Sequence, residues 1–278
     1  MRIIESIKIT KTIQRLCIEA NCRLPEDVTK RIIKMLDEES WEPAIKQLEL
    51  ILENAKLAKE RCDPICQDNG VVCVFMEIGQ NLIINGDLND AVNEGVRRGY
   101  KEGYLRSSIA DPTSRKNTGD NTPAMLYTEI VSGDAIKITV APKGFGGENM
   151  SKLKMLLPSA GEVGITEFVL SVVKEAGANP CPPIVVGVGI GGTFDKCALL
   201  SKKALFRPFD QPNPNPDIHA LEKRLLDEIN KTGIGPQGFG GKTTALHVAI
   251  ETMPTHIAGL PCAVNINCHA SRHATEVI

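Results

Sequence analysis

Apolar side chains in the first 61 residues recur at the spacing of amphipathic helices. One stripe follows Pro25 and two acids, a sequence typical of a first helical turn, and a second covers 42–61. The stripes consist of Val28, Ile32, Ile33 and Leu36, then Ile45, Leu48, Ile51, Leu52 and Ala55. The pattern predicts a helical N-terminal segment over 1–61, which would form a helical layer or a subunit contact.

From Gly70 onwards, short runs rich in Val and Ile alternate with further helical stretches. Strands are expected at 71–76, 127–131, 135–140, 184–188, 245–250 and 263–267, and helices at 90–104, 165–176, 195–204 and 218–231. The turn sequence Ser132-Gly133-Asp134 between two of these strands indicates a hairpin, and the prolines of 208–216 predict a loop. The order of elements favours an α+β fold, with irregular mixed sheets flanked by helices, over a regular βαβ series.

Composition and charge describe an ordinary globular chain. Its 278 residues suit one large domain or two small ones, and the 24% of charged and 42% of hydrophobic residues exclude intrinsic disorder. A net charge of −2 provides no general field for nucleic acid or an anionic membrane surface, so neither is expected as a partner. The N-terminal sequence lacks the apolar core of a signal peptide, and no apolar run approaches the length of a membrane span. These features favour a cytoplasmic protein.

Two glycine-rich segments resemble nucleotide-binding motifs. Residues 187–192 fit G-x-G-x-x-G between an apolar strand and a helix, which is the context of a dinucleotide site. Such a site also needs a second strand with an acidic end, and 207–212 contains two prolines and no strand pattern. We therefore favour glycines that permit a tight strand-to-helix turn, although amides at that helix start could hold an anion.

The second segment, 240–243 with the sequence GGKT, invites comparison with a phosphate-binding loop. That motif requires glycine at the position that Pro236 occupies, and Gly235 lies one place too early. Proline also lacks the backbone N–H that a phosphate cradle uses. A nucleotide triphosphatase is therefore poorly supported.

Nine cysteines are present, and no two of them form a C-x-x-C pair. This argues against zinc ribbons, ferredoxin-type runs and thioredoxin-type redox pairs. In a reducing compartment we expect thiols, metal ligands or catalytic residues rather than disulfides. Five cysteines lie in predicted helices or strands and are expected to be small buried hydrophobic residues. These five are Cys17, Cys22, Cys73, Cys197 and Cys262.

Three others, Cys66, Cys181 and Cys268, stand in turn-rich or proline-rich segments at element boundaries, where a rigid scaffold commonly presents ligands. Three thiolates leave one iron of a four-iron cluster open, and an open iron can act as a Lewis acid, as an open zinc site does. Cys62 is a minor candidate for a fourth ligand. Spacing alone leaves buried thiols and a zinc site as alternatives.

Several of these segments together resemble the class I, iron–sulfur-dependent fumarate hydratases, and in particular the α subunit of their two-subunit form. The matching segments are 64–68 (PICQD), 117–121 (NTGDN), 143–149, 179–183 (NPCPP), 187–193, 233–244 and 265–272. They occur in family order over nearly the whole chain. The L-tartrate dehydratase α subunit is related and shares much of this pattern.

The resemblance implies a [4Fe–4S] cluster bound by Cys66, Cys181 and Cys268, with the substrate on the fourth iron. It also implies a single cluster-binding catalytic domain over 1–278. The family's second, β domain is expected on a separate chain, because this sequence ends at Ile278, soon after the third cysteine. A homodimer or an α2β2 assembly is expected, and this chain alone should have little activity.

The same resemblance implies roles for five further residues. Gln67 and Asp68 match residues that face the substrate, and Arg106 matches an arginine that holds a substrate carboxylate. Gly146 matches a backbone contact to the substrate. His256 matches an active-site histidine that would pair with Asp68.

Structural roles compete with these assignments. Asp68 fits a residue that caps an Asp-Asn-Gly turn. Arg106 fits a solvated arginine at a helix end, and His256 fits a loop histidine beside Pro254. Asn69 stands where the family usually has Thr, and it is expected to tune the loop without changing the ligand set.

The expected function is the reversible hydration of fumarate to malate, a citric acid cycle reaction, by a hydro-lyase. In this hypothesis Asp68, aided by His256, protonates the departing hydroxyl, and a base on the β subunit removes the C3 proton. L-tartrate or a mesaconate-type acid is an alternative substrate, because all are small dicarboxylic acids. A metal-binding or cluster-binding scaffold without catalysis is an alternative of another class.

Overall fold

Three helices occupy the predicted helical N-terminal segment after a short strand, and the second and third of them lie where the two apolar stripes predicted helices. The computed structural model describes residues 2–278, and the first elements are β1 (Arg2–Glu5), α1 (Ser6–Cys22), α2 (Glu26–Glu38) and α3 (Glu42–Arg61). Two acids lie in the first turn of α2, where the helix dipole favours negative charge. Lys59 and Arg61 lie in the last turn of α3, which is the complementary arrangement.

The chain forms two compact units, and each draws on separate stretches of the sequence. Unit 1 contains Met1–Pro25, Asn54–Gly144 and Arg272–Ile278, and unit 2 contains Glu26–Glu53 and Phe145–Ser271. The predicted N-terminal segment 1–61 therefore contributes to both units. That the whole of 1–278 acts as one cluster-binding domain stays a prediction.

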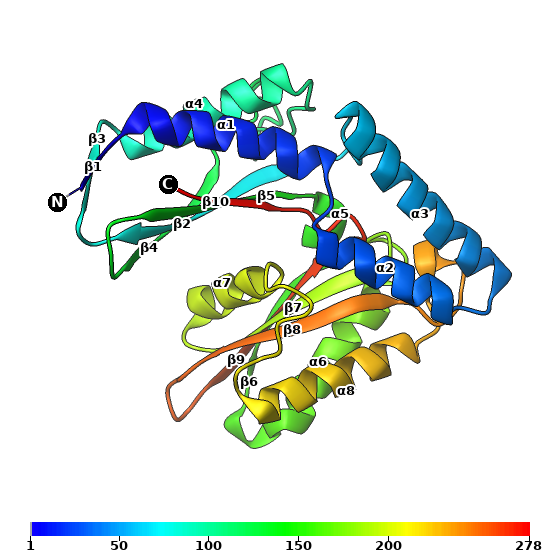
Figure 1. Cartoon of the computed structure of the whole chain (residues 1–278). Helices are drawn as coiled ribbons and strands as arrows, with labels where there is room; N and C mark the ends of the chain where they lie inside the picture. Colours follow the sequence, from blue (N-terminus) through cyan, green and yellow to red (C-terminus); the bar gives the residue numbers. More distant parts are fainter. Residues whose placement is uncertain (1) are drawn as a thin grey trace. The chain divides into compact units, whose positions relative to one another are not determined.

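Unit 1 is a four-stranded sheet with α1 and α4 packed on it (Figure 1). Its further elements are β2 (Val71–Gly79), β3 (Leu82–Asn85), α4 (Leu88–Glu102), β4 (Met125–Val131), β5 (Ile136–Lys143) and β10 (Ala274–Val277). The strand order is β10-β5-β2-β4, with β2 parallel to β4 and antiparallel to β5, and β1 pairs with β3 in a separate ribbon. Buried side chains of both helices and the sheet, among them Ile13, Val96 and Ile138, form its core.

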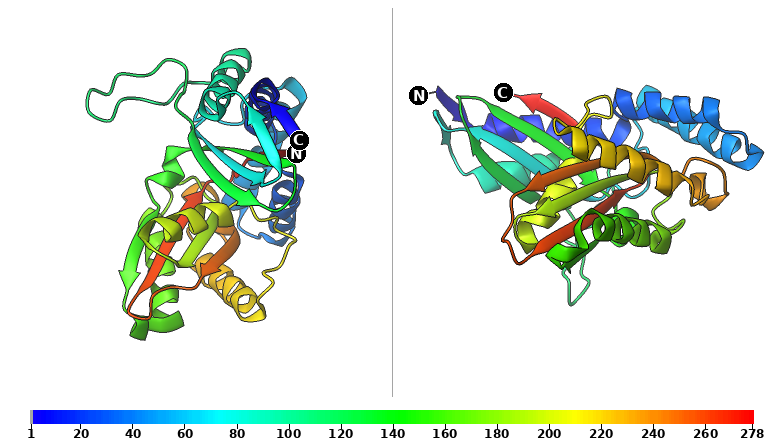
Figure 2. Two further views of the ribbon diagram at one scale, coloured as in Figure 1. Left: turned by 90° about the vertical axis from the view of Figure 1, so that its left-hand side faces the viewer. Right: turned by 90° about the horizontal axis from the view of Figure 1, so that it is seen from below.

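Unit 2 is built around a second four-stranded sheet, which Figure 2 shows from two further directions. Its elements after α2 are α5 (Phe145–Glu148), β6 (Lys152–Leu156), α6 (Gly161–Ala176), β7 (Ile184–Gly191), α7 (Phe194–Ala204), α8 (Pro216–Asn230), β8 (Ala245–Met253) and β9 (Leu260–Asn267). The strand order is β6-β9-β7-β8. Val186 and Val188 of β7 join the core with α6 and α8, whereas Gly187 and Gly189 contact α7. Since successive residues of a strand face opposite sides, helices cover both faces of this sheet.

The predicted hairpin of 127–131 and 135–140 is wrong, although both strands form. A short turn connects β4 to β5, but β2 lies between them in the sheet and pairs with both. The turn crosses the end of β2, where Gly79 N donates to Ala135 O at 2.9 Å. A Cβ at Gly79 would lie 2.6 Å from Gly133 O, so this crossing requires glycine. The turn sequence therefore indicated the reversal of the chain but not the pairing partner.

Unit 2 repeats this strand topology. Its central strand, β7, pairs in parallel with β8 and antiparallel with β9, and the β8–β9 connection again crosses the end of the central strand. Gly191 lies at this crossing with φ +90°, and a Cβ there would overlap Met253 O. The two units therefore share this strand order. In each unit a glycine, Gly79 or Gly191, lies where the connection crosses the end of the central strand.

The architecture confirms the expected α+β class, with mixed sheets flanked by helices. Gly187 and Gly189 of the dinucleotide-like motif let α7 pack closely on β7, since an added Cβ would overlap Ser201 O or Cys197 O. The GGKT segment leads into strand β8, whereas a phosphate-binding loop precedes a helix. Within residues 2–278, no helix has the length and apolar character needed to cross a membrane.

Candidate functional site

The nine cysteines divide by environment as their sequence settings predicted. The five in helices or strands are buried. Burial raises the pKa of the Cys197 thiol to about 11 and that of Cys262 to about 12. The remaining four, which are exposed or half-buried, are Cys62, Cys66, Cys181 and Cys268. Because metal ligands must be thiolates, the four cysteines outside the apolar core are the candidates.

In unit 1, Asn69 organises the loop that carries Cys66. Its amide Nδ2 donates to Cys66 O at 2.9 Å, and its Oδ1 accepts the backbone N–H of Arg106 at 2.6 Å. Tyr100 of α4 donates its hydroxyl to Asn69 O at 2.6 Å. The loop is thereby joined both to α4 and to the segment that carries Arg106.

Asp68 forms the turn that its sequence predicted, because its Oδ1 accepts the N–H of Gly70 at 2.9 Å. Its own backbone N–H donates to Cys66 Sγ at 3.4 Å. Beside its Oδ2 lies Gly144, where an added Cβ would stand 3.1 Å from that oxygen. Asp68 therefore has a structural role in the turn and adjoins the cysteine sulfur.

Gln67 and Arg106 are exposed beside this loop. The Cys66 thiol donates to Gln67 Oε1 at 3.4 Å, and Arg106 is held at its backbone by Asn69. Unit 1 thus brings together four of the predicted site residues, Cys66, Gln67, Asp68 and Arg106. Cys66 Sγ thus contacts a side-chain amide and a backbone N–H, and Asn69 joins the backbone of Arg106 to the same loop.

Arg272 is a further charged residue of this region that the sequence did not single out. Its side chain is only 4% exposed, and its guanidinium donates to Asp68 O. Among the described residues, its Nε and Nη1 have no hydrogen-bond partner. The one available signal was its place at the end of the 265–272 segment, because the carbonyl it binds lies 204 positions away in the sequence.

In unit 2, Cys181 and Cys268 lie at the same end of the sheet. His269, the residue after Cys268, donates its backbone N–H to Cys181 O at 3.3 Å, and its Nδ1 lies 3.0 Å from the same oxygen. Cys181 itself has the left-handed φ of +53°. Gly146 joins this group, since a Cβ there would lie 3.5 Å from Asn179 O. Unit 2 thus brings Gly146, Cys181 and Cys268 together.

The structure does not bring His256 to these cysteines. His256 is an exposed residue of the β8–β9 connection, and its Nδ1 accepts the N–H of Ala258 at 3.1 Å. Cys268 directly follows the other end of β9, which is eight residues long. At about 3.3 Å per residue, the strand separates the two by about 26 Å. The predicted pairing of His256 with Asp68 stays a prediction.

An iron–sulfur cluster requires cysteine thiolates that lie outside the apolar core. Among residues 2–278, no group of three or more His, Cys, Asp or Glu side chains has the arrangement of a metal site. The donor chemistry nevertheless fits: three cysteines lie outside the apolar core in tightly hydrogen-bonded loops. An N–H···S hydrogen bond such as that from Asp68 N to Cys66 Sγ is a contact that tunes cluster sulfurs.

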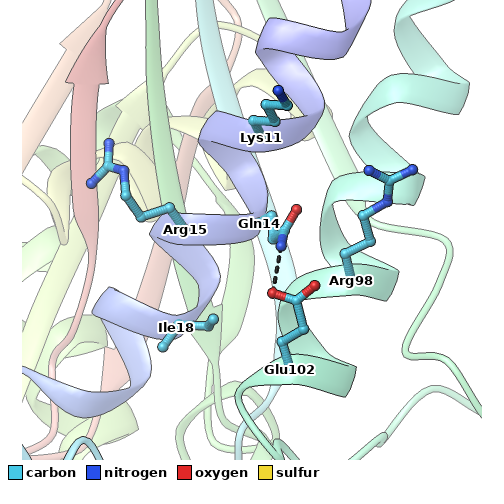
Figure 3. Close-up of a pocket in the computed structure, with 6 residues that line it drawn as sticks. All are labelled: Lys11, Gln14, Arg15, Ile18, Arg98 and Glu102. Carbon is cyan, nitrogen blue, oxygen red and sulfur yellow. Dashed lines mark hydrogen bonds between the residues drawn. The ribbon is translucent and has the colours of Figure 1, made fainter.

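A separate groove lies between α1 and α4 of unit 1 and has a volume of about 440 Å³ (Figure 3). Its lining residues are Lys11, Gln14, Arg15, Ile18, Arg98 and Glu102. Within it, Gln14 Nε2 donates to Glu102 Oε2 at 2.6 Å. Arg15 forms ion pairs with Glu19 and Glu276. None of the predicted site residues lines this groove, and both of its arginines form ion pairs.

Comparison with known proteins identifies the family. The model of the fumarate hydratase (Fumerase) family matches residues 10–277 of this chain. This chain belongs to the fumarate hydratase family. The expected relationship to class I fumarate hydratase α subunits and to tartrate dehydratase is confirmed.

Two relatives in the fumarate hydratase family cover nearly all of the chain. The protein named "Putative L(+)-tartrate dehydratase subunit alpha" from Methanocaldococcus jannaschii is 43% identical over 279 residues, which is 98% of each chain. The L(+)-tartrate dehydratase subunit alpha of Escherichia coli O157:H7 is 30% identical over 275 residues, 98% of this chain and 91% of the relative. Similarity therefore extends through both units.

Proposed function

We propose that this chain is the cluster-bearing α subunit of a hydro-lyase that reversibly hydrates fumarate to malate. In this proposal Cys66, Cys181 and Cys268 bind a [4Fe–4S] cluster. The observation that carries it is the Cys66 loop, in which the half-buried thiol contacts Gln67 Oε1 and Asp68 N, and Asn69 holds the backbone of Arg106. A structural metal site needs no carboxylate-binding group, so this polar set favours catalysis over a scaffold role. The family match supports the same conclusion.

The bound cluster would supply Lewis-acid chemistry at an iron without a protein ligand. The residues of this chain would bind and orient the substrate. The Arg106 guanidinium suits a bidentate contact to a carboxylate, Gln67 supplies an amide, and Gly146 supplies backbone approach without a side chain. Asp68 would give its proton to the departing hydroxyl, with Gly70 N–H holding Oδ1 and thereby the orientation of the carboxyl group.

L-tartrate is the second candidate substrate, and one observation favours it. Of the two relatives described above, the one at 43% identity is named "Putative L(+)-tartrate dehydratase subunit alpha" and the one at 30% is named L(+)-tartrate dehydratase subunit alpha. Tartrate carries one hydroxyl group more than malate, and mesaconate carries one methyl group more than fumarate. Groups that bind the two carboxylates serve all of these acids, so the choice depends on side chains near the central carbons.

The proposal includes a separate β subunit. The relatives carry the name "subunit alpha", which supports a partner chain that supplies the remaining substrate contacts and the base for the C3 proton. A homodimer of this chain or an α2β2 assembly would follow. A cytoplasmic setting, expected from the absence of a signal-peptide core and of a membrane-length apolar run, belongs to the same proposal, and its reducing conditions would keep the cysteines as thiols.

The test is anaerobic co-production with the β subunit, followed by measurement of iron per α chain and of turnover with fumarate, malate and L-tartrate. We expect about four irons per chain, loss of the cluster in Cys66→Ser, Cys181→Ser and Cys268→Ser, and intact clusters in Cys62→Ser. Asp68→Asn keeps the Oδ1 acceptor of the turn but cannot give an acid proton, so it should retain its iron and lose at least about 100-fold in kcat. A chain that binds zinc or no metal would contradict the proposal. Turnover of tartrate alone would move it to the second substrate.

A further inference from the structure

The segment 233–244, which contains the GGKT sequence of 240–243, lies at the same end of unit 2 as Cys181 and Cys268. One residue of this segment, Gln237, sits in a short 3-10 turn, Pro236–Gly238, with φ +53° and ψ +17°. This left-handed conformation is uncommon for a residue other than glycine. Such a residue persists only where the surrounding contacts fix it.

Gln237 contacts both cysteine loops of unit 2. Its backbone N–H and its side-chain Nε2 both donate to Pro182 O, at 2.7 and 2.8 Å. Pro182 directly follows Cys181. The same Nε2 lies 3.1 Å from Nδ1 of His269, which directly follows Cys268. One amide group therefore spans the residues next to two cysteines that are 87 positions apart in the sequence.

The segment around Gln237 is itself anchored, so the amide has a fixed base. Trp41 donates its Nε1–H to Phe239 O at 2.9 Å. The buried carboxylate of Glu39 accepts the N–H of Lys242 at 2.7 Å and that of Trp41 at 3.1 Å. Burial alone would raise the pKa of Glu39, but these backbone hydrogen bonds outweigh it and hold the pKa low. An ionised carboxylate thus fastens the segment to the loop between α2 and α3.

The side-chain amide of Gln237 affects how His269 joins the two cysteine loops. Its Nδ1 is within reach of a donor, Gln237 Nε2, and of an acceptor, Cys181 O. Nδ1 can serve only one of them at a time, since it either bears a hydrogen or offers a lone pair. The amide of Gln237 therefore competes with the Cys181 carbonyl for this ring and influences how the two loops are joined.

We propose that Gln237 is a positioning residue that sets the spacing of Cys181 and Cys268 and so preorganises two of the three cluster ligands. The inference rests on the proposed cluster site. It also gives the 233–242 segment a role that does not involve a nucleotide. Gln237 touches the residues beside the ligands, and partners of this kind commonly change metal affinity 10- to 100-fold when altered, as a rough range.

The test uses Gln237→Glu in the α chain with its β subunit. The variant keeps the size of the side chain but removes both Nε2 donors and places a carboxylate against Pro182 O. Gln211→Glu provides the matched control, because Gln211 is an exposed residue of the same unit. Trp41, the single tryptophan, reports by fluorescence whether the segment around Phe239 remains in place.

Two measurements are made on each protein. The first is the rate at which the visible absorption of the cluster is lost in air, which should rise about tenfold or more in Gln237→Glu and stay unchanged in Gln211→Glu. The second is the yield of a Cys181–Cys268 cross-link with a short bifunctional thiol reagent in the apo chain, mapped by mass spectrometry. We expect a clear loss of this cross-link in Gln237→Glu only.

Equal cluster lifetimes and equal cross-linking in the two variants would overturn the role of Gln237. A wild-type chain that takes up no cluster would remove the proposed function, and the cross-link would then still decide the positioning role. A Gln237→Glu chain with altered Trp41 fluorescence has lost the whole segment. In that case Gln237→Gly, which accepts the left-handed φ and keeps the backbone N–H to Pro182 O, replaces it and should show the same two effects.

Discussion

The side chain of Asn69 is buried and forms hydrogen bonds to two segments, the Cys66 loop and the segment that begins at Arg106. An amide carries a donor and an acceptor on the same carbon atom, and Asn69 uses the first for Cys66 O and the second for Arg106 N. A threonine hydroxyl is shorter and cannot reach both groups in the same way. These contacts support the expectation that asparagine at this position tunes the loop. The hydrogen bond from Arg106 N to Asn69 Oδ1 also fixes the backbone position from which the Arg106 side chain extends.

His247 is the residue with the clearest pH-dependent consequence. It lies in β8 and stacks on Phe209 with ring centroids 4.5 Å apart. Burial, with smaller contributions from the positive charges of Arg207 and Arg31, lowers its pKa to about 3. The folded state therefore holds the ring neutral, while the unfolded chain binds a proton below about pH 6.5. His247 contributes no penalty above that pH and costs about 1.4 kcal/mol per pH unit below it.

We expect His247→Phe, which keeps an aromatic ring against Phe209, to remove this acid sensitivity. Between pH 6.5 and 4.5 the free energy of unfolding of the wild-type chain should fall by about 2 kcal/mol more than that of the variant. Urea unfolding at a series of pH values measures both slopes, so the different burial energies of the two rings cancel. Parallel slopes would contradict the assigned environment of His247.

The environment of a residue could be predicted from the sequence where it depends on neighbouring residues. It could not be predicted where it depends on contacts with residues far away in the sequence. The five cysteines inside regular elements are buried as predicted, because an apolar strand or helix carries its own burial pattern. Gln237 and Arg272 gave no such signal. Their partners, Pro182 O and Asp68 O, lie 55 and 204 positions away.

At the scale of elements, the two units show why strands were easier to predict than their pairing. Each run of Val and Ile formed a strand within a few residues of its predicted range. The partner of each strand depends on where a helix returns the chain, and a turn sequence does not contain that information. The short strands β1, β3, β6 and β10 were missed, since four or five residues do not establish a period of two.

The contact of β7 with α7 gives a prediction at this scale. A Cβ at Gly189 would overlap Cys197 O and lie 2.6 Å from Ser201 N, so Gly189→Ala must push the helix away from the strand. We expect a loss of about 1–3 kcal/mol in the free energy of unfolding, as in other overpacked cores. Gly146→Ala is the control for stability, because its Cβ would make an ordinary contact at 3.5 Å. Equal urea midpoints for the two variants would show that the glycine is not needed for packing.

At the scale of the whole molecule, the position of His256 constrains the assembly. Since β9 separates His256 from Cys268 by about 26 Å, a His256 that serves a site containing Cys268 has to come from a second copy of the chain. The exposed side chain of Ile257 next to it, 91% exposed, is consistent with a connection that packs against another surface. The proposed pairing of His256 with Asp68 therefore depends on the expected homodimer or α2β2 assembly.

Mixing inactive variants tests this arrangement. Neither His256→Ala nor Cys268→Ser should be active alone, yet co-produced chains should recover about a quarter of wild-type turnover, because half of random dimers are mixed and each holds one intact site. Tagged pairs purified to homogeneity should reach about half. No recovery in purified mixed assemblies would exclude a shared site, and full activity of His256→Ala alone would remove the histidine from the mechanism.

The interleaving of the units also orders events during synthesis. Unit 1 needs residues 272–278, which supply strand β10 along β5 and the Arg272 contact to Asp68 O. A nascent chain that has reached Ser271 already contains all nine cysteines, but its Cys66 loop still lacks this contact. Residues 272–278 therefore complete unit 1 after all nine cysteines have been synthesised, and iron loading should follow the synthesis of these residues rather than precede it.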